Sequence, residues 1–419
     1  MQVRFSGGPT GAPLWFLVTL DPAHPDAPEP AEAFDGYGAA LAVGDFDADG
    51  YDDLAVGIPE NWGESLNGIP AQVGGVQIHY GRSPSDLGIQ VAAEHFLDEG
   101  SPGVVGEPFS EERFGHALAV GDFNGDGHDD LAIGASGDWV FAPRGVQGGQ
   151  VHVAHGHAGG AGEDDAGKVL VVYGSPASLV LPDHRYFGSL ELGGESQPGM
   201  RFGQALAAGD FDGDGRDDLA IGSPRFDGQG TPQPVDMGLV AVAYGPPLDS
   251  LRVHWIDENV LYGPGAGEAN DSFGWALAAG DFDGDGVDDL AVGTPGEDIE
   301  AVGIANTGAV SVVPGQFDAS VIRAPRQLRP VGGFDVLTFQ DPAGLIPDYR
   351  GGAPIYGWAL AAGDFDGNGF ADLAIGAPTR DRFDPSHIQD AGAVAVLYGQ
   401  LFADGFEAGS LHAWSSPAR

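Results

Sequence analysis

The chain has 419 residues, and its 62 acidic against 17 basic side chains give a formal net charge of −45. Such a charge repels nucleic acid and anionic membrane surfaces, so we expect neither as a partner. The absence of cysteine excludes disulfides, thiol catalysis and cysteine-ligated zinc, and no apolar run is long enough for a membrane-spanning helix. A disordered acidic chain is also excluded, because 42% of the residues are hydrophobic and only 19% are charged.

The first predicted element is the short apolar segment from Leu14 to Leu20. It has neither a basic start nor a small-residue cleavage site. We therefore interpret it as a strand and not as a signal peptide or a membrane insertion.

Five repeated units follow, and they start near residues 37, 114, 202, 273 and 356. Each unit begins with an aromatic–glycine pair, such as Phe202-Gly203, and continues through an apolar strand, an acidic loop and a second apolar strand. A third strand lies between two glycines, as from Gly238 to Gly245, and a weaker fourth strand precedes the next unit. Apolar residues alternate with period two, which predicts strands rather than helices.

This pattern predicts an all-β fold, a β-propeller of five blades with about four antiparallel strands each. Residues 1–399 would form a single propeller, and residues 400–419 would form a C-terminal tail. The last unit stops soon after Gly399 without a fourth strand of its own. We expect residues 14–20 to complete the fifth blade and close the ring, because closure protects exposed sheet edges.

An acidic loop of the form Asp-x-Asp/Asn-x-Asp/Asn-Gly-x-x-Asp joins the first and second strands of every unit. Alternating side-chain oxygens on a tight loop, together with a backbone carbonyl at position seven, are ligands that Ca²⁺ prefers. The sequence therefore predicts up to five calcium ions. The expected ligands at positions one, three, five, seven (carbonyl) and nine are Asp45, Asp47, Asp49, Tyr51 and Asp53; Asp122, Asn124, Asp126, His128 and Asp130; Asp210, Asp212, Asp214, Arg216 and Asp218; Asp281, Asp283, Asp285, Val287 and Asp289; and Asp364, Asp366, Asn368, Phe370 and Asp372.

Comparison among the loops refines this hypothesis. An EF-hand needs a glutamate at position twelve and a helix on each side of the loop. Here position twelve is Val or Ile, and apolar residues alternate in the flanking segments as in strands, so an EF-hand is excluded. Asp and Gly can also form plain turns, but five copies with one spacing favour metal binding. Loops two and five contain Asn124 and Asn368, so we expect them to bind calcium more weakly. Position eight is aspartate in four loops but Ala371 in the fifth, so it should face solvent or cap the backbone.

The aromatic–glycine pair, the acidic loop and a following Gly-x-Pro, such as Gly222-Ser223-Pro224, resemble the FG-GAP repeat of integrin α-subunit heads and bacterial surface proteins. The resemblance covers all five units, from Tyr37 to Gly399, although the second unit has Gly134-Ala135-Ser136 in place of Gly-x-Pro. It implies a calcium-binding propeller. The family commonly has seven blades, whereas this sequence provides five.

Alternate loops of an antiparallel meander emerge on opposite faces of a blade, so the long variable loops should share the face opposite the acidic loops. We expect a protein or carbohydrate ligand there. The candidate contacts, each of which could instead pack over a blade edge, are Trp62, Trp139, Phe141, Arg225, Phe226, Arg380 and Phe383. A zinc site at His152, His155 and His157 is a weaker alternative, because neighbouring members would point to opposite faces of a strand.

These features favour a monomeric, extracellular or cell-surface module for recognition or adhesion that is not an enzyme. The patterned carboxylates are assigned to the loops, and no nucleophile elbow or zinc-protease motif is present. Two alternatives stay open. One is a propeller hydrolase with paired carboxylates in its channel, and the other is a structural part of a larger surface protein.

Overall fold

The structure is a computed structural model of the chain. It describes residues 2–5, 16–19, 36–64, 70–81, 95–98, 101, 113–137, 167–173, 180–189, 192–228, 234–245, 252–298, 308–315, 326–328, 355–365, 367–378 and 393–397. Five antiparallel sheets follow one another along the chain, one for each repeated unit, which confirms the predicted all-β, five-bladed propeller.

Blade one contains β3 (Ala40–Gly44), β4 (Asp53–Gly57), β7 (Val76–His79) and β8 (His95–Leu97). Blade two contains β9 (Phe114–Gly121), β10 (Asp130–Ala135), β11 (Lys168–Tyr173) and β12 (Val180–Phe187). Blade three contains β13 (Ala205–Gly209), β14 (Asp218–Ser223), β15 (Leu239–Ala243) and β16 (Val253–Ile256). Blade four contains β17 (Ala276–Gly280), β18 (Asp289–Thr294), β19 (Ala309–Val313) and β20 (Arg326–Leu328). Blade five contains β21 (Ala359–Gly363), β22 (Asp372–Ala377) and β23 (Ala393–Leu397).

The predicted closing strand behaves differently from the expectation. A strand does form there, β2 (Phe16–Thr19), but it pairs with β1 (Gln2–Phe5) in a separate hairpin. Among the described residues, blade five has three strands and β23 pairs only with β22. The hydrophobic pattern of the segment predicted its conformation, but it could not specify which edge it pairs with, because pairing is a long-range choice.

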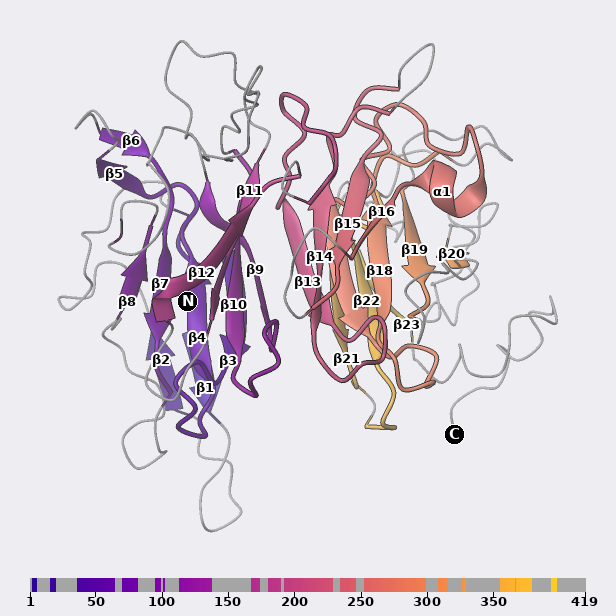
Figure 1. Cartoon of the computed structure of the whole chain (residues 1–419). Helices are drawn as coiled ribbons and strands as arrows, with labels where there is room; N and C mark the ends of the chain where they lie inside the picture. Colours follow the sequence, from indigo (N-terminus) through magenta and orange to yellow (C-terminus); the bar gives the residue numbers. More distant parts are fainter. Residues whose placement is uncertain are drawn as a thin grey trace, which may run out of the picture.

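Two smaller elements lie at one end of the blades. The strands β5 (Trp62–Glu64) and β6 (Pro70–Gln72) form a hairpin between β4 and β7, and helix α1 (Glu258–Tyr262) follows β16. In Figure 1 both lie at the top of the view, whereas the loops between the first and second strands of the blades lie at the bottom. No helix of the described residues has the length and apolar character needed to cross a membrane.

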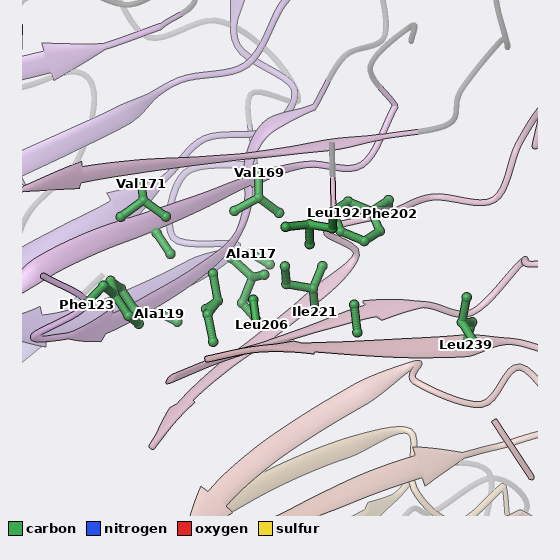
Figure 2. Packing of buried hydrophobic residues seen from close by; sticks show 14 of the residues in the cluster. Ala117, Ala119, Phe123, Val169, Val171, Leu192, Phe202, Leu206, Ile221 and Leu239 are labelled. Carbon is green, nitrogen blue, oxygen red and sulfur yellow. The ribbon is translucent and has the colours of Figure 1, made fainter. Parts of the chain in front are cut away.

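The hydrophobic core is divided among the interfaces between neighbouring blades. In β14, Leu219 and Ile221 pack against blade two, whereas Ala220 packs towards blade four. We call these two sides the back face and the forward face of a blade. Large and small side chains from the two blades interdigitate at each interface, and Figure 2 shows the interface of blades two and three, where Ala117 lies beside Leu206 and Ile221.

The two ends of the repeat motif meet across each interface. Phe202 is fully buried between blades two and three, and Gly203 after it adopts a φ of 83°. Its carbonyl oxygen lies so close to Gly134 of blade two that a Cβ added there would be only 2.2 Å away. The aromatic residue supplies apolar area, and the glycine at the end of the second strand lets the next blade approach. The motif thus encodes the contact between blades.

Candidate metal centre and recognition face

Each acidic loop is held in shape by its own carboxylates. In loop three, Asp210 accepts the backbone N–H groups of Asp214 and Gly215, both at 2.9 Å. Asp214 in turn accepts the N–H of Arg216 at 3.1 Å. Loops one, two, four and five repeat the bonds from positions five and six to the position-one carboxylate. The backbone therefore turns around one point, as the spacing predicts.

The position-nine aspartate anchors the acidic loop to its blade, and loop one is an example. Asp53 is buried, and it accepts the N–H of Phe46 at 2.8 Å and that of Gly81 at 2.7 Å. It thereby ties the acidic loop to the end of the third strand. Burial, reinforced by the charges of Asp47 and Asp45, raises the pKa of Asp53 to about 7.

The position-nine aspartates of two further loops also have raised pKa values. Burial, with the charges of neighbouring loop aspartates, raises the pKa of Asp218 to about 8 and that of Asp289 to about 7. Carboxylates with raised pKa values lack a neutralising partner, and a divalent cation among them would supply one. The donor set consists of oxygen atoms alone, which fits Ca²⁺.

Three of the predicted sites have carboxylate oxygens that converge within 4.8 Å of one another. The converging groups are Asp45, Asp47 and Asp53 in loop one, Asp210, Asp212 and Asp218 in loop three, and Asp281, Asp283 and Asp285 in loop four. Loop two brings Asn124 to 3.4 Å from Asp130 through its amide. In loop five, Asp366 lies outside the described residues. The assignment of all twenty-five ligands remains a prediction.

An arginine next to loop three was not predicted. Arg252 forms an ion pair with Asp212 and lies over the ring of Tyr244, with the guanidinium carbon 5.4 Å from the ring centroid. A cationic side chain at this position neutralises part of the charge that would attract calcium. We therefore expect loop three to bind calcium less tightly than loops one and four, although its carboxylate count is the same.

The aspartates at position eight connect neighbouring blades. Asp129 accepts the N–H of Asp45 at 2.8 Å, and Asp217 and Asp288 make the same bond to the first loop residue of the preceding blade. The prediction that this position caps the backbone is confirmed for these three. The sequence did not indicate that the capped backbone belongs to another blade.

The residues predicted to contact a partner differ in their exposure. Trp62 and Arg225 are exposed, which is compatible with the prediction. Phe226 is 6% exposed and packs in the core between blades two and three, so its predicted role as a surface contact is wrong. The other candidates, Trp139, Phe141, Arg380 and Phe383, lie outside the described residues, as do His152, His155 and His157.

A pair of tryptophans on the same face was missed by the sequence analysis. Trp275 and Trp358 follow the aromatic–glycine pairs of blades four and five, at the end of the first strand opposite the acidic loops. Their ring centroids are 4.7 Å apart, and Trp358 is 44% exposed. The equivalent residues His116 and Gln204 lie 3.5 Å apart in blades two and three. The signal was available, because the position directly after each aromatic–glycine pair varies among the repeats.

Two other features of this face lay outside the predicted sites. A cavity of about 530 Å³ is lined by Phe226, Trp255, Glu195 and Asn259, among others. A fourth acidic cluster, of Glu258, Asp271 and Glu297, is buried beside α1 with carboxylate oxygens within 4.8 Å of one another. It unites one residue from each of three separate segments, so no spacing in the sequence could reveal it.

Comparison with known proteins identifies the repeat. The FG-GAP repeat family matches residues 37–61, 114–153, 202–233, 273–313 and 356–397, which correspond to the five blades. The chain is an FG-GAP repeat protein. Integrin alpha-PS2 of Drosophila melanogaster is 30% identical over 281 residues, a match that covers 65% of this chain and 16% of the integrin. Integrin alpha-5 of Xenopus laevis is 28% identical over 292 residues, 67% of this chain and 22% of the integrin.

An enzyme is also among the relatives of this FG-GAP protein. Phosphatidylinositol-glycan-specific phospholipase D of Rattus norvegicus is 33% identical over 211 residues, which cover 49% of this chain and 21% of the enzyme. A rhamnogalacturonan lyase of Bacillus licheniformis aligns structurally with a TM-score of 0.37 and 15% identity, over 80% of this chain and 46% of the lyase. The chain thus spans about a fifth of the length of the curated relatives it matches.

The similarity to phosphatidylinositol-glycan-specific phospholipase D contradicts the prediction that the chain is not an enzyme. That prediction assumed that a repeat whose carboxylates build metal loops belongs to non-catalytic proteins. The phospholipase D match shows that a region similar to this repeat array also occurs in an enzyme. A scaffold motif carries information about fold and says nothing about whether catalysis accompanies it.

Proposed function

We propose that this FG-GAP protein is a calcium-stabilised recognition module that works outside the cell or at its surface. The observation that carries the proposal is the convergence of carboxylate oxygens within 4.8 Å in loops one, three and four. Five such loops concentrate negative charge at one end of the propeller. Calcium at these loops would neutralise that charge and hold the first two strands of each blade together.

The proposed extracellular setting is compatible with the chemistry of the loops. Calcium sites of extracellular modules typically have Kd values of about 10⁻⁴–10⁻³ M, so they fill only where calcium is millimolar. The similarity to integrin α-subunits supports the same setting.

Recognition is assigned to the face opposite the acidic loops. The support comes from the half-buried Trp275 and the exposed Trp358, which together offer a large, rigid apolar area of the kind that dominates binding interfaces. The exposed Trp62 and Arg225 lie at the same end of the blades. A protein or carbohydrate ligand remains the proposed partner class.

Calcium binding is tested by isothermal titration of the chelator-treated protein with calcium chloride. We expect up to five sites, and the loss of one in the Asp45→Asn, Asp47→Asn double variant. The matched control is Asp52→Asn, which removes an exposed carboxylate from the same loop but outside the converging group. Heat of binding that is absent, or equally reduced in both variants, would contradict the assignment of the ligands.

Recognition is tested separately, with an array of oligosaccharides and extracellular-matrix proteins probed in millimolar calcium. We expect the Trp275→Ala, Trp358→Ala double variant to lose a signal that the Tyr51→Ala variant retains, because Tyr51 is a 42% exposed aromatic residue on the opposite, acidic-loop face. A signal that the double variant retains in full would place the ligand elsewhere.

A further inference from the structure

The position-eight aspartate of blade four, Asp288, contacts the first predicted ligand of loop three at two points. Its carboxylate oxygen Oδ2 accepts the backbone N–H of Asp210 at 3.1 Å. Its own backbone N–H donates to the carbonyl oxygen of Asp210 at 3.0 Å. Both polar groups of the Asp210 backbone are therefore held by the next blade, across the interface between the forward face of blade three and the back face of blade four.

The contact between these two aspartates is also closely packed. Gly209 directly precedes Asp210, and a Cβ added at Gly209 would lie 2.9 Å from the Oδ2 atom of Asp288 and 3.1 Å from its Cβ. Glycine leaves room for this approach because it has no side chain. A shift of Asp288 must therefore move Asp210 as well, since no free space separates the two segments.

Asp210 is the residue around which loop three turns. Its carboxylate accepts the N–H groups of Asp214 and Gly215, both at 2.9 Å, and it belongs to the group of oxygens that converge in this loop. The backbone of Asp210 sets the direction of that carboxylate. Asp288 therefore influences the geometry of loop three, although it is not one of the predicted ligands.

Asp288 is in turn placed between two predicted ligands of loop four. Val287 would supply its carbonyl oxygen from position seven, and Asp289 would supply its carboxylate from position nine. An ion in loop four would fix both chain neighbours of Asp288, and with them the carboxylate that holds Asp210. A segment that one ion has ordered does not have to be ordered again when the next ion binds, which is a source of positive cooperativity.

We propose that Asp288 is a positioning residue through which calcium in loop four strengthens calcium binding in loop three. The inference rests on the proposed calcium binding of these loops and goes beyond it, because it makes neighbouring sites depend on one another. Linked binding is reciprocal, so calcium in loop three strengthens binding in loop four by the same factor.

The other interfaces offer the same connection to different degrees. Asp129 bonds to the N–H of Asp45, and Asp217 bonds to the N–H of Asp122, which links loop two to loop one and loop three to loop two. Ala371 has no carboxylate at this position, and its backbone N–H alone reaches the carbonyl oxygen of loop four at 3.2 Å. We therefore expect the coupling between loops four and five to be the weakest of these four.

The test reads the occupancy of loop three with terbium, a luminescent substitute for calcium that a nearby tyrosine sensitises. Loop one carries Tyr51 at position seven, and none of the other four acidic loops contains tyrosine or tryptophan. The parent chain for the test is therefore Tyr51→Phe with Arg216→Tyr, which moves the tyrosine to the exposed position seven of loop three. The luminescence that Arg216→Tyr adds to that of Tyr51→Phe alone reports loop three.

Loop four is then weakened in this parent chain by the pair Asp283→Asn and Asp285→Asn. Both substitutions occur naturally at the same positions of other loops, as Asn124 and Asn368, so the loop should keep its shape. The titrations use about 0.15 M salt, in which exposed charges more than about 8 Å apart are largely screened. We expect the terbium concentration that half-saturates loop three to rise about fivefold or more, the lower end of the coupling usual between linked sites.

Two further variants show whether the effect passes through Asp288. With Asp288→Ala, which copies Ala371 of loop five, weakening loop four should no longer change the half-saturation of loop three. The matched control is Asp217→Ala, which removes the same side chain from loop three itself. This control should keep the dependence on loop four, because Asp217 holds Asp122 of the preceding blade.

The proposal is overturned if weakening loop four leaves the half-saturation of loop three unchanged. It is also overturned if the rise is the same with and without the Asp288 carboxylate, because the loops would then be coupled by charge alone or Asp288 would serve only the packing of the blades. A chain that gives neither terbium luminescence nor heat of calcium binding would refute the proposed calcium sites themselves, so the two failures are distinguishable.

Discussion

The interfaces between blades should dominate stability, and one pair of phenylalanines tests this directly. Phe123 and Phe365 occupy position two of loops two and five, but they are 0% and 53% exposed. Truncation of a fully buried phenylalanine costs about 3–5 kcal/mol, from lost burial and the cavity left behind. Complete burial of such a side chain is worth about 1.5–3 kcal/mol, so a half-exposed one should cost about 1 kcal/mol or less. Phe123→Ala should therefore lose about 2–4 kcal/mol more than Phe365→Ala.

The assay is urea unfolding of the dilute protein in saturating calcium, followed by fluorescence and circular dichroism. Equal losses for the two variants would refute the reasoning, because they would mean that Phe365 is packed as well as Phe123. A small loss at Phe123 would instead refute the packing of blades two and three.

Three further predictions follow from the loops and the interfaces. The raised pKa values of Asp53, Asp218 and Asp289 mean that the metal-free native state binds more protons than the unfolded state between about pH 4 and 8. In chelator, the melting temperature should therefore fall as the pH rises from about 5 to 8. In calcium, the melting temperature should rise over the same range, because protons no longer displace the ion. The same dependence of melting temperature on pH in both conditions would contradict this prediction. Arg252→Ala should strengthen calcium binding at loop three by up to about fivefold, which is the equivalent of about 1 kcal/mol for a partly exposed ion pair. If titration shows unchanged or weaker binding, the arginine supports the site instead of competing with calcium. Gly222→Ala would place a Cβ 2.2 Å from the carbonyl oxygen of Gly274 and should lower the free energy of unfolding by about 1–3 kcal/mol or more. Gly376→Ala should lower it less, because the nearest contact of the added Cβ is 3.3 Å away in its own blade. The reverse order in urea unfolding would exclude the close approach of blades three and four.

The repeat made much of this fold accessible to sequence analysis. Every unit repeats the same residue pattern, so the strands, the acidic loops and the number of blades could be predicted by comparing the units with one another. The substitution of Ala371 for aspartate in loop five correctly separated the capping position from the ligand positions. Comparison among units works here because each unit occupies the same environment.

The same reasoning failed where the environments of the units differ. Val394 and Phe365 are the same residue types as their buried counterparts in other blades, so only the structure shows that they are exposed in blade five. Phe226 lies in a variable loop, and its burial depends on a space between two blades that no local pattern encodes. Arg252 reaches loop three from the start of another strand, forty residues away in sequence, and periodicity does not report such contacts.

The calcium dependence of folding tests the central claim most directly. The measurement is thermal unfolding of the full chain in millimolar calcium and in chelator. A ligand that binds only the native state stabilises it by mass action, so occupied loops should raise the melting temperature clearly above that in chelator. Identical melting curves in the two conditions would contradict the account, because the five acidic loops would then be turns that hold themselves together without a metal ion.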